Sequence, residues 1–316
     1  MPPPPDLSHH ILPESESRRI FTTEILPADL PPTLIPRQGR PLAVVIVGQT
    51  GAGKSSTAPA VLSAMTRIHR PAHLIADAYK AYHPAYLSLL ASDTPANTGP
   101  ATNPDARKWL IMAAAEAISR KLDVLFESAC RHLDDFRELM RMLGRAEYRV
   151  EVVVMAVPAA LSRLGILHRF HEKLREAASK NLPKRLKPVK IHDDSYQGLM
   201  SVAEWIDEVD FVDRVLVVRR GNMVAFSDER VEGGQLQGKV AEAIMKERER
   251  PLTAEERRFA LRDLEKLEAR DAEAAGEIMV LLEPLLGDKV EGYPELSLVR
   301  WDFPPLDPSK ALKFEA

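Results

Sequence analysis

The stretch that most constrains the fold of this chain is "GQTGAGKSS" at residues 48–56, directly after the apolar run "PLAVVIVG". It satisfies the pattern G-x-x-x-x-G-K-[ST] and lies between a segment typical of a buried strand and an Ala-rich segment typical of a helix. Glycines at 48, 51 and 53 allow the backbone to turn tightly and to direct its N–H groups at phosphate oxygens. We therefore expect a strand, a phosphate-binding loop and a helix rather than an ordinary Gly-rich turn.

The residue types in this loop also predict how a nucleotide is held. The Lys54 ammonium should reach the β- and γ-phosphates, and the Ser55 hydroxyl should ligate Mg²⁺. The loop does not identify the group that receives the phosphate. The residues expected around the phosphates are Gly48, Gln49, Thr50, Gly51, Ala52, Gly53, Lys54, Ser55 and Ser56.

From Pro41 onward, short apolar segments alternate with helical ones. Continuous Val- and Leu-rich strands are typical of a parallel sheet that helices cover on both faces. Two β-rich segments flank Gly221-Asn222, which predicts a turn between a last pair of strands. We therefore predict an α/β fold: a P-loop kinase-like three-layer α/β/α architecture with a mostly parallel sheet and extra C-terminal helices. The other expected strands are "LAVVIVG", "HLIAD" ending at Asp77, "DVLFE" ending at Glu127 and "YRVEVVVMAV", and the expected helices span about 54–68, 105–122, 133–143 and 159–180.

Two shifts in composition divide the chain. Proline clusters mark the start, where the pair His9 and His10 is more typical of a solvated arm than of a metal-binding tract. The charged stretch "TAEERRFALRDLEKLEARDAEAAGEIMVLLEPLL" has apolar residues at helical spacing and predicts a pair of helices that pack on the core. We expect a Pro-rich N-terminal extension with one short helix, a P-loop kinase core, and a C-terminal helical region with an irregular tail, at residues 1–40, 41–228 and 229–316.

Composition excludes several classes of partner and compartment. The formal net charge of −3 gives no electrostatic reason to expect nucleic acid or an anionic membrane as a partner. Cys130 is the one cysteine, which rules out an internal disulfide framework. The N-terminus lacks the pattern of a secretory signal, and no apolar run is long enough to span a bilayer. We therefore expect a cytoplasmic protein without membrane insertion.

Two carboxylates come at the ends of expected strands, where open α/β sheets bind their ligands. An enzyme that phosphorylates a hydroxyl needs a carboxylate to accept the proton, opposite the γ-phosphate. Asp77 suits that role, and Glu127 could hold other hydroxyls of the acceptor or a magnesium-bound water. Helix capping or a surface ion pair is the alternative for each residue.

The rest of the sequence favours a compact kinase over a motor or a switch. No hydrophobic run ends in the paired acids of a motor ATPase, and no N-K-x-D motif for base recognition is present. Cations stabilise the charge on a transferring phosphoryl group, but at most two or three can reach it. A solvated helix face is the alternative for most of the candidates, which are Arg163, Arg169, Arg175, Lys184, Arg185, Lys187 and Lys190.

Several ordered blocks together resemble the zeta toxins of bacterial toxin–antitoxin systems. After the phosphate loop, "ADAYKAYHPAY" is similar to that family's second-strand block, and "LFESACR" is similar to its Glu-Gly-Thr-x-Arg block. "VVMAVPAALSRLGILHRF" is similar to its Met-Ala-Val-Pro block, and "RLKPVKIHDD" to its Arg, Pro and His-Asp sequence. With the late strand pair "VLVVRRGNMVAFS", the resemblance covers about residues 15–228.

The resemblance implies a kinase that uses ATP or GTP with Mg²⁺ and phosphorylates the 3′-hydroxyl of the amino sugar in UDP-N-acetylglucosamine. The product starves peptidoglycan synthesis. In this implied assignment, Lys54 and Ser55 hold phosphate and Mg²⁺, Asp77 is the general base, and Arg169 and Arg185 stabilise the transferring phosphate.

The resemblance also implies residues that contact the sugar nucleotide. Glu127 and Arg131 match such positions, and Glu116 matches a further carboxylate on the preceding helix only when a gap is introduced. A toxic kinase needs restraint, which implies a separately encoded antitoxin protein or neutralisation by the N-terminal segment 8–30.

Two departures from the family pattern keep the acceptor open. Ser128-Ala129 stands where the family has Gly-Thr, and Ile75 stands where an acidic residue often precedes the base. An acceptor such as NAD, a nucleoside or an antibiotic is therefore the alternative to a UDP-sugar. A regulator that binds nucleotide without catalysis is the second alternative.

Overall fold

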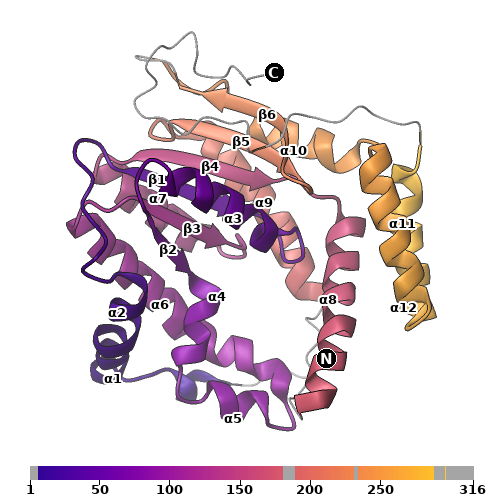
Figure 1. Ribbon diagram of the computed structural model, residues 1–316, viewed down its shortest axis with the longest axis horizontal. Coiled ribbons are helices and arrows are strands. Elements are labelled where there is room, and N and C mark those ends of the chain that lie inside the picture. The colour runs from indigo at the N-terminus through magenta and orange to yellow at the C-terminus, as the bar shows by residue number, and fades with distance from the viewer. Residues whose placement is uncertain (1–5, 181–188, 231–233, 288–295, 297–316) are drawn as a thin grey trace.

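The computed structural model describes residues 6–180, 189–230, 234–287 and Leu296, and the side chains of 173–180 are not among those described. Six strands form one sheet in the order β2-β3-β1-β4-β5-β6 (Figure 1). The first five strands run parallel, and β6 is antiparallel to β5. This arrangement confirms the predicted α/β fold with its mostly parallel sheet and the turn at Gly221-Asn222. The strands are β1 (Leu42–Val47), β2 (Ala72–Ile75), β3 (Val124–Ser128), β4 (Arg149–Met155), β5 (Arg214–Arg219) and β6 (Met223–Glu229).

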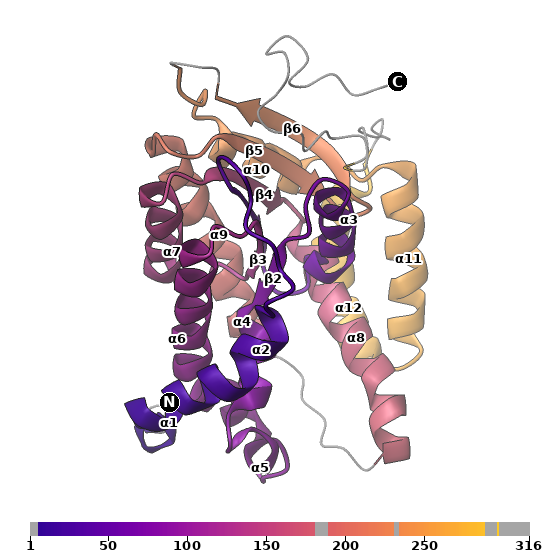
Figure 2. The same cartoon turned by 60° about the vertical axis from the view of Figure 1, so that its left-hand side comes forward.

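Helices cover both faces of the sheet, which explains why its central strands are apolar throughout. Every residue of β1 and β4 is buried. Alternate residues of β1 enter two separate hydrophobic clusters, one beneath α6, α7, α9 and α10, and the other beneath α3, α8, α11 and α12. Figure 2 shows the two helical layers on either side of the sheet. These helices are α3 (Lys54–Thr66), α6 (Thr98–Ser119), α7 (Leu133–Arg145), α8 (Ala159–Lys180), α9 (Val189–Glu208), α10 (Val240–Glu249), α11 (Ala254–Glu268) and α12 (Ala272–Leu282).

The structure corrects two boundaries expected from the sequence. The second strand ends at Ile75, and Asp77 lies in the first turn of a short helix, α4 (Ala76–Tyr79). Helix α6 begins at Thr98 and runs through Pro104, although the missing N–H of that proline favoured a later start. In addition, helix α9 was not predicted, because its first two turns bury the polar residues His192 and Ser195 and its buried face becomes apolar only from Leu199.

The N-terminal extension is more helical and more buried than expected. Helix α1 (Glu14–Ile20), a π-helical turn over Phe21–Ile25 and α2 (Leu26–Asp29) form one nearly continuous helical segment instead of one short helix. Ile20 and Ile25 belong to the main hydrophobic core, and Trp109 Nε1 donates to the Ser17 carbonyl at 2.9 Å. The segment is therefore built into the same core as α6, beside which it lies in Figure 2.

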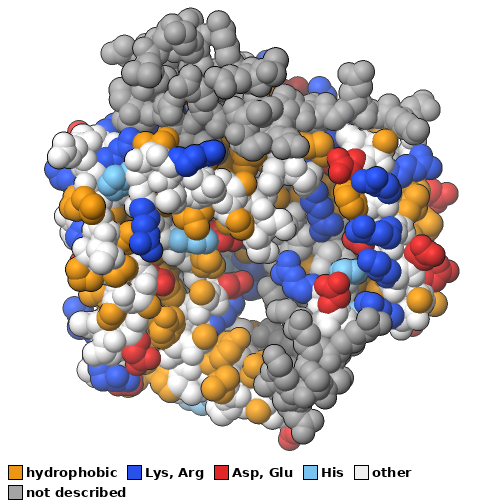
Figure 3. All heavy atoms as spheres, in the orientation of Figure 1, with side chains coloured by type: hydrophobic (Ala, Val, Ile, Leu, Met, Phe, Trp, Pro, Cys, Tyr) orange, Lys and Arg blue, Asp and Glu red, His pale blue; other side chains and the backbone are white. Residues whose placement is uncertain are grey.

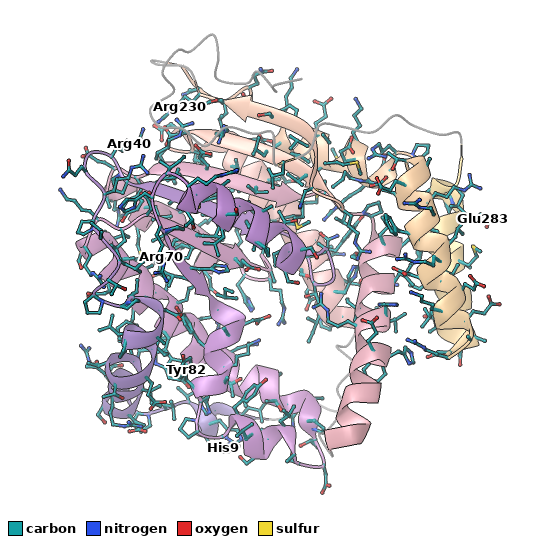
Figure 4. All side chains as sticks on the ribbon, viewed as in Figure 1. His9, Arg40, Arg70, Tyr82, Arg230 and Glu283 are labelled. Atoms are coloured by element: carbon teal, nitrogen blue, oxygen red, sulfur yellow. The ribbon has the colours of Figure 1, made fainter. Side chains whose placement is uncertain are left out.

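The residues before α1 are also docked. His83 Nε2 donates to the carbonyl of His10 at 3.0 Å, so the expected solvated arm is tied to the turn after α4. Figure 4 labels His9 at the lower edge of the molecule, with Tyr82 above it. At the other end of the sheet, the labelled Arg40 and Arg230 both pair with Asp213, at 2.8 and 2.9 Å.

The C-terminal region confirms the expected pair of helices, α11 and α12, and adds α10 before them. Thr253 and Glu256 form a capping box that starts α11. Leu264, Leu267 and Ile278 pack in the same cluster as Leu161 and other residues of α8. The predicted irregular tail lies outside the described residues, apart from Leu296. None of the described helices combines the length and apolar character that a bilayer-spanning segment needs.

Candidate active site

The phosphate loop connects β1 to α3 and requires glycine at several positions. Gly51 and Gly53 have φ of +82° and +103°, which side chains rarely adopt. At Gly48, an added Cβ would lie 2.8 Å from Met155 Cβ, so the β4 backbone leaves no room for one. The loop ends at the first residue of α3, Lys54, whose Nζ donates to the Gly48 carbonyl at 2.6 Å.

The first turn of α3 presents two hydroxyls at the surface. Ser55 and Ser56 are both exposed. The unpaired N–H groups at the start of a helix and its dipole favour an anion at this point. The loop therefore has the geometry predicted for phosphate binding, with the Ser55 hydroxyl beside it.

Two hydrogen bonds attach the phosphate loop to other parts of the molecule. The buried Gln49 side chain donates from Nε2 to the Val157 carbonyl at 2.5 Å, between β4 and α8. The Thr50 N–H donates to Ser195 Oγ of α9 at 3.1 Å. Helix α9 thus supplies a support for the loop that the sequence gave no reason to expect, because the two segments lie far apart in the chain.

Buried Ser162 and His192, with the partly exposed Asp193, form a hydrogen-bonded series that continues this support. Ser162 Oγ lies 2.8 Å from His192 Nε2, and His192 Nδ1 lies 2.8 Å from Asp193 Oδ1. Since a carboxylate only accepts, the ring proton belongs on Nδ1 and Nε2 accepts from the Ser162 hydroxyl. Burial lowers the pKa of His192, which keeps the ring neutral near pH 7. Ser162 is fully buried, so this series positions α8 and α9 beneath the loop and does not present a nucleophile.

Next to the loop lies a cavity of about 550 Å³ at the carboxyl ends of β2 and β3. It extends from Lys54 to α4 and is lined further by the inward turns of α6 and by α7. Figure 3 shows the surface hollowed between the α4 side and the α8 side of the molecule. The predicted site residues that line this cavity are Lys54, Asp77, Glu127 and Arg131.

Asp77 lies at the mouth of the cavity. Its side chain is 63% exposed, and its Oδ1 is 2.6 Å from Lys80 Nζ. Lys80 follows Asp77 by three residues, so both point to the same side of the helical turn. Lys80 therefore holds the Asp77 carboxylate in place at the mouth of the cavity.

Glu127 lies deeper, at the end of β3. Its side chain is 10% exposed, and its Oε1 is 2.9 Å from Nε2 of His73 on the neighbouring strand β2. His73 fixes one carboxylate oxygen and leaves the other to face the cavity. The sequence did not single out His73, because its contact with Glu127 depends on the pairing of β2 with β3.

The α6–α7 wall of the cavity carries cations together with the carboxylates of Asp135 and Glu138. Arg107 of α6 pairs with Asp135 at 3.0 Å, and Nε of Arg131 is buried without a hydrogen-bond partner among the described residues. Burial and then the charge of Arg107 lower the pKa of His132. Burial also raises the pKa of the Cys130 thiol, in the same wall, to about 12, so this thiol is uncharged. The wall therefore offers positive charge to an anionic ligand.

Three other predicted site residues are not among the residues that line this cavity. Glu116 lies one turn beyond the last cavity-lining turn of α6 and faces a separate cavity of about 600 Å³ formed with Leu26, Leu30 and Leu34. Arg169 is exposed on α8 and does not line the cavity. Arg185 lies outside the described residues. The side of α6 that does line the cavity carries Arg107 and Lys108 instead.

Comparison with protein families matches the description "Zeta toxin" over residues 31–232, which is more than half of the chain. The chain belongs to the zeta toxin family. This match confirms the resemblance drawn from the sequence blocks. No curated protein matches the chain.

Solved structures give a matching fold for this zeta toxin family member. A chain of the PezAT chromosomal toxin–antitoxin system of Streptococcus pneumoniae superposes with a TM-score of 0.64 at 17% identity, covering 82% of this chain and 98% of that one. A putative kinase from Chloroflexus aurantiacus has a TM-score of 0.39 at 18% identity, covering 51% and 80%. The AvrRxo1-ORF1:-ORF2 complex with ATP has a TM-score of 0.46 at 15% identity, covering 87% and 85%. At these identities, the first of them establishes the P-loop kinase-like fold.

Proposed function

We propose that this zeta toxin family member transfers the γ-phosphate of ATP or GTP to a sugar hydroxyl of a UDP-activated sugar, specifically the 3′-hydroxyl of UDP-N-acetylglucosamine. The observation that carries the proposal is the single cavity lined by Lys54, Asp77, Glu127 and Arg131. It places a phosphate loop and a carboxylate on two sides of one space, as phosphoryl transfer to a hydroxyl requires.

On the donor side, the loop N–H groups and the α3 N-terminus hold the phosphates. The Lys54 ammonium leaves its loop carbonyls for the β- and γ-phosphate oxygens. Among the described residues, His, Cys, Asp and Glu side chains form no group of three that could hold a metal ion. This fits Mg²⁺ that arrives with the nucleotide, because Mg²⁺ keeps waters and phosphate oxygens and needs few protein ligands, here Ser55. The bound ion neutralises negative charge on the phosphates.

On the acceptor side, Asp77 takes the proton of the attacking hydroxyl. Glu127, held by His73, accepts hydrogen bonds from other hydroxyls of the sugar. Arg131 and Arg107 face the diphosphate of the sugar nucleotide. The family resemblance assigns Arg169 and Arg185 to charge stabilisation around the transferring group, although Arg169 does not line the cavity in this structure.

The consequence of this reaction in a cell is a block of cell-wall synthesis, and we infer that the protein acts as a toxin in the cytoplasm. Restraint then falls to a separate antitoxin protein. Residues 8–30 pack on α6, and no described residue before Lys54 lines the cavity. Their packing favours the antitoxin over self-inhibition.

A different acceptor is the second candidate, and one observation favours it. Ile75 and Ala129, where the sequence departs from the family pattern, both line the cavity. They remove an acidic group and a hydroxyl from the acceptor pocket, which changes the hydrogen bonds that the pocket offers. NAD, a nucleoside or an antibiotic is the acceptor in that case, with the same donor side.

The experiment that tests the proposed function measures phosphorylation of several candidate acceptors. The protein is incubated with ATP or GTP, Mg²⁺ and either a UDP-sugar, NAD, a nucleoside or an aminoglycoside, and products are identified by mass spectrometry and ³¹P NMR. We expect phosphorylated UDP-N-acetylglucosamine. Turnover of another compound alone supports the second candidate, and nucleotide binding without any phosphorylated product supports a non-catalytic regulator.

A further inference from the structure

Two consecutive arginines at the end of β5 face different parts of the molecule. Arg219 is fully buried, and its Nε lies 2.8 Å from Glu256 Oε1 of α11. Its Nη1 donates to the Glu247 carbonyl at the end of α10. Arg250 joins the same cluster, at 2.7 Å from Glu247 and 3.2 Å from Glu256. Through Arg219, β5 is therefore tied to α10 and α11.

Arg220 faces the phosphate loop. Its Nη2 donates to the Gly51 carbonyl at 2.7 Å. Because the peptide bond is planar and trans, a fixed Gly51 carbonyl also fixes the Ala52 N–H on the opposite side, which turns into the loop toward Gln49. Burial lowers the pKa of the Arg220 guanidinium to about 10, so it stays protonated near pH 7. The contact is thus a charge-assisted hydrogen bond to the loop backbone.

Helix α8 leaves room for this contact. Gly165 lies where an added Cβ would overlap Nη2 of Arg220 and would lie 3.2 Å from the Gly51 carbonyl oxygen. A glycine inside a helix costs about 1 kcal/mol relative to alanine, so its presence in α8 has a reason in the space that it opens. The phosphate loop and α8 are also in close contact at Gly51, where an added Cβ would overlap the Ser162 carbonyl of α8.

The C-terminal helices support this corner from outside. Helices α11 and α12 pack against α8, as Figures 1 and 2 both show. The charge of Asp263 on α11 raises the pKa of Arg220, and the charge of Arg169 on α8 lowers it. The guanidinium therefore lies where β5, α8, α11 and the phosphate loop meet.

We propose that Arg220 is a positioning residue for the phosphate loop, and that the C-terminal helices α10 and α11 set the loop geometry for the nucleotide through the Arg219–Arg220 pair. The C-terminal region then has a role in binding the donor, although none of its described residues lines the acceptor cavity. This proposal rests on the proposed nucleotide binding by the loop.

The test compares nucleotide and acceptor parameters in single variants. Arg220→Lys keeps the charge but shortens the reach to Gly51, and Gly165→Ala adds one methyl group where Nη2 now lies. We expect each variant to raise the dissociation constant of a fluorescent ATP analogue about tenfold, as loss of one hydrogen bond to a charged group predicts. The KM for the acceptor should stay unchanged. Glu256→Gln, which loosens Arg219, should give a smaller rise.

Arg149→Lys is the matched control. Arg149 is also buried and ion-paired, with Glu151 and Glu229, but at the other end of the sheet. It should lower the melting temperature while the nucleotide dissociation constant stays at the value of the unmodified protein.

The outcomes separate this proposal from the proposed function. If the unmodified protein binds nucleotide and both Arg220→Lys and Gly165→Ala bind it equally well, the positioning role of Arg220 is wrong while the function stands. If Arg149→Lys weakens nucleotide binding as much as Arg220→Lys, the effect is general destabilisation and the proposal is also wrong. If the unmodified protein binds no nucleotide, both the function and the proposal are overturned.

Discussion

The donor side and the acceptor side of this site are held in different ways. Each of the loop residues Gln49, Thr50 and Gly51 is contacted from another element, through Val157, Ser195 and Arg220. On the acceptor side, the key carboxylates are held by side chains instead: Asp77 by Lys80, and Glu127 by His73. The donor side is built from backbone and buried contacts, and the acceptor side from side chains that face a cavity.

This difference indicates which part of the reaction is fixed by the fold and which part is adjustable. A phosphate loop binds the same group in every nucleotide, so its backbone can be held from all sides. An acceptor pocket lined by side chains changes with single substitutions, as at Ile75 and Ala129. The phosphate donor is therefore a property of the fold, and the acceptor is a property of a few cavity residues.

The largest effect on nucleotide affinity should come from Gly51→Ala, which breaks the donor side. The alanine has to adopt φ near +82° and its Cβ overlaps the Ser162 carbonyl. To relieve this overlap the loop backbone has to move away from α8 and out of its present geometry, so nucleotide affinity should fall at least about tenfold. Isothermal titration with ATP and Mg²⁺ measures it.

Gly39→Ala is the control for that variant. Gly39 has φ of +86°, but no atom lies within 4 Å of an added Cβ. The same backbone strain without the overlap should leave nucleotide affinity unchanged. Equal losses in the two variants would contradict the close fit between the loop and α8.

A second, smaller effect should appear on the acceptor side alone. His73→Leu removes the partner of the Glu127 carboxylate and should raise the KM for the acceptor about tenfold, with no change in nucleotide affinity. Steady-state kinetics with each substrate varied in turn measures the split. His69→Leu, on the loop before β2 and beside Asp123, is the control. A rise in the KM for ATP in His73→Leu would show that the two sides are not separate.

Ser195→Ala should weaken the donor side modestly. It removes the acceptor for the Thr50 N–H, a loss of about 1 kcal/mol, so nucleotide affinity should fall about fivefold. Ser88→Ala removes an exposed hydroxyl bonded only within its own helix and serves as the control. Unchanged nucleotide affinity in Ser195→Ala would mean that α9 does not support the loop.

The smallest effect concerns pH. The lowered pKa of the buried His192 means that the unfolded chain binds a proton as pH falls through 6.5, while the folded chain does not. The free energy of unfolding should therefore fall as pH is lowered through that value. His192→Asn should make this fall shallower, and His9→Asn, at an exposed position, should not. Urea denaturation at pH 7.5 and 5.5 compares the slopes, and identical slopes in all three proteins would contradict a neutral buried His192.

Local sequence signals predicted the donor side well. The apolar run of β1, the glycines of the loop and the start of α3 at Lys54 all follow from adjacent residues. The turn at Gly221-Asn222 and the pair α11 and α12 also follow from local patterns. Asp77 and Glu127 were placed near the cavity because strand ends can be predicted from the sequence, although Asp77 lies two residues past its strand, in the first turn of α4.

Contacts between distant segments could not be predicted in the same way. Arg220 and Gly51 are 169 positions apart, and Thr50 and Ser195 are 145 positions apart, so no local pattern joins them. The sequence alone gives no reason for Gly165 inside α8, whereas the structure places the Arg220 guanidinium where an added Cβ would lie. Glu116 has the residue type expected for the site, but the packing of α6 against the N-terminal segment directs it elsewhere.

The most direct test of a two-sided site is product formation by Asp77→Asn, measured beside nucleotide affinity in the same preparation. The variant keeps the shape of the side chain but removes the proton acceptor, so phosphorylation of the acceptor should fall about a thousandfold while ATP binds as in the unmodified protein. Asp134→Asn, at a nearly fully exposed position of α7, should retain full activity. Full phosphorylation of the acceptor by Asp77→Asn would contradict the account.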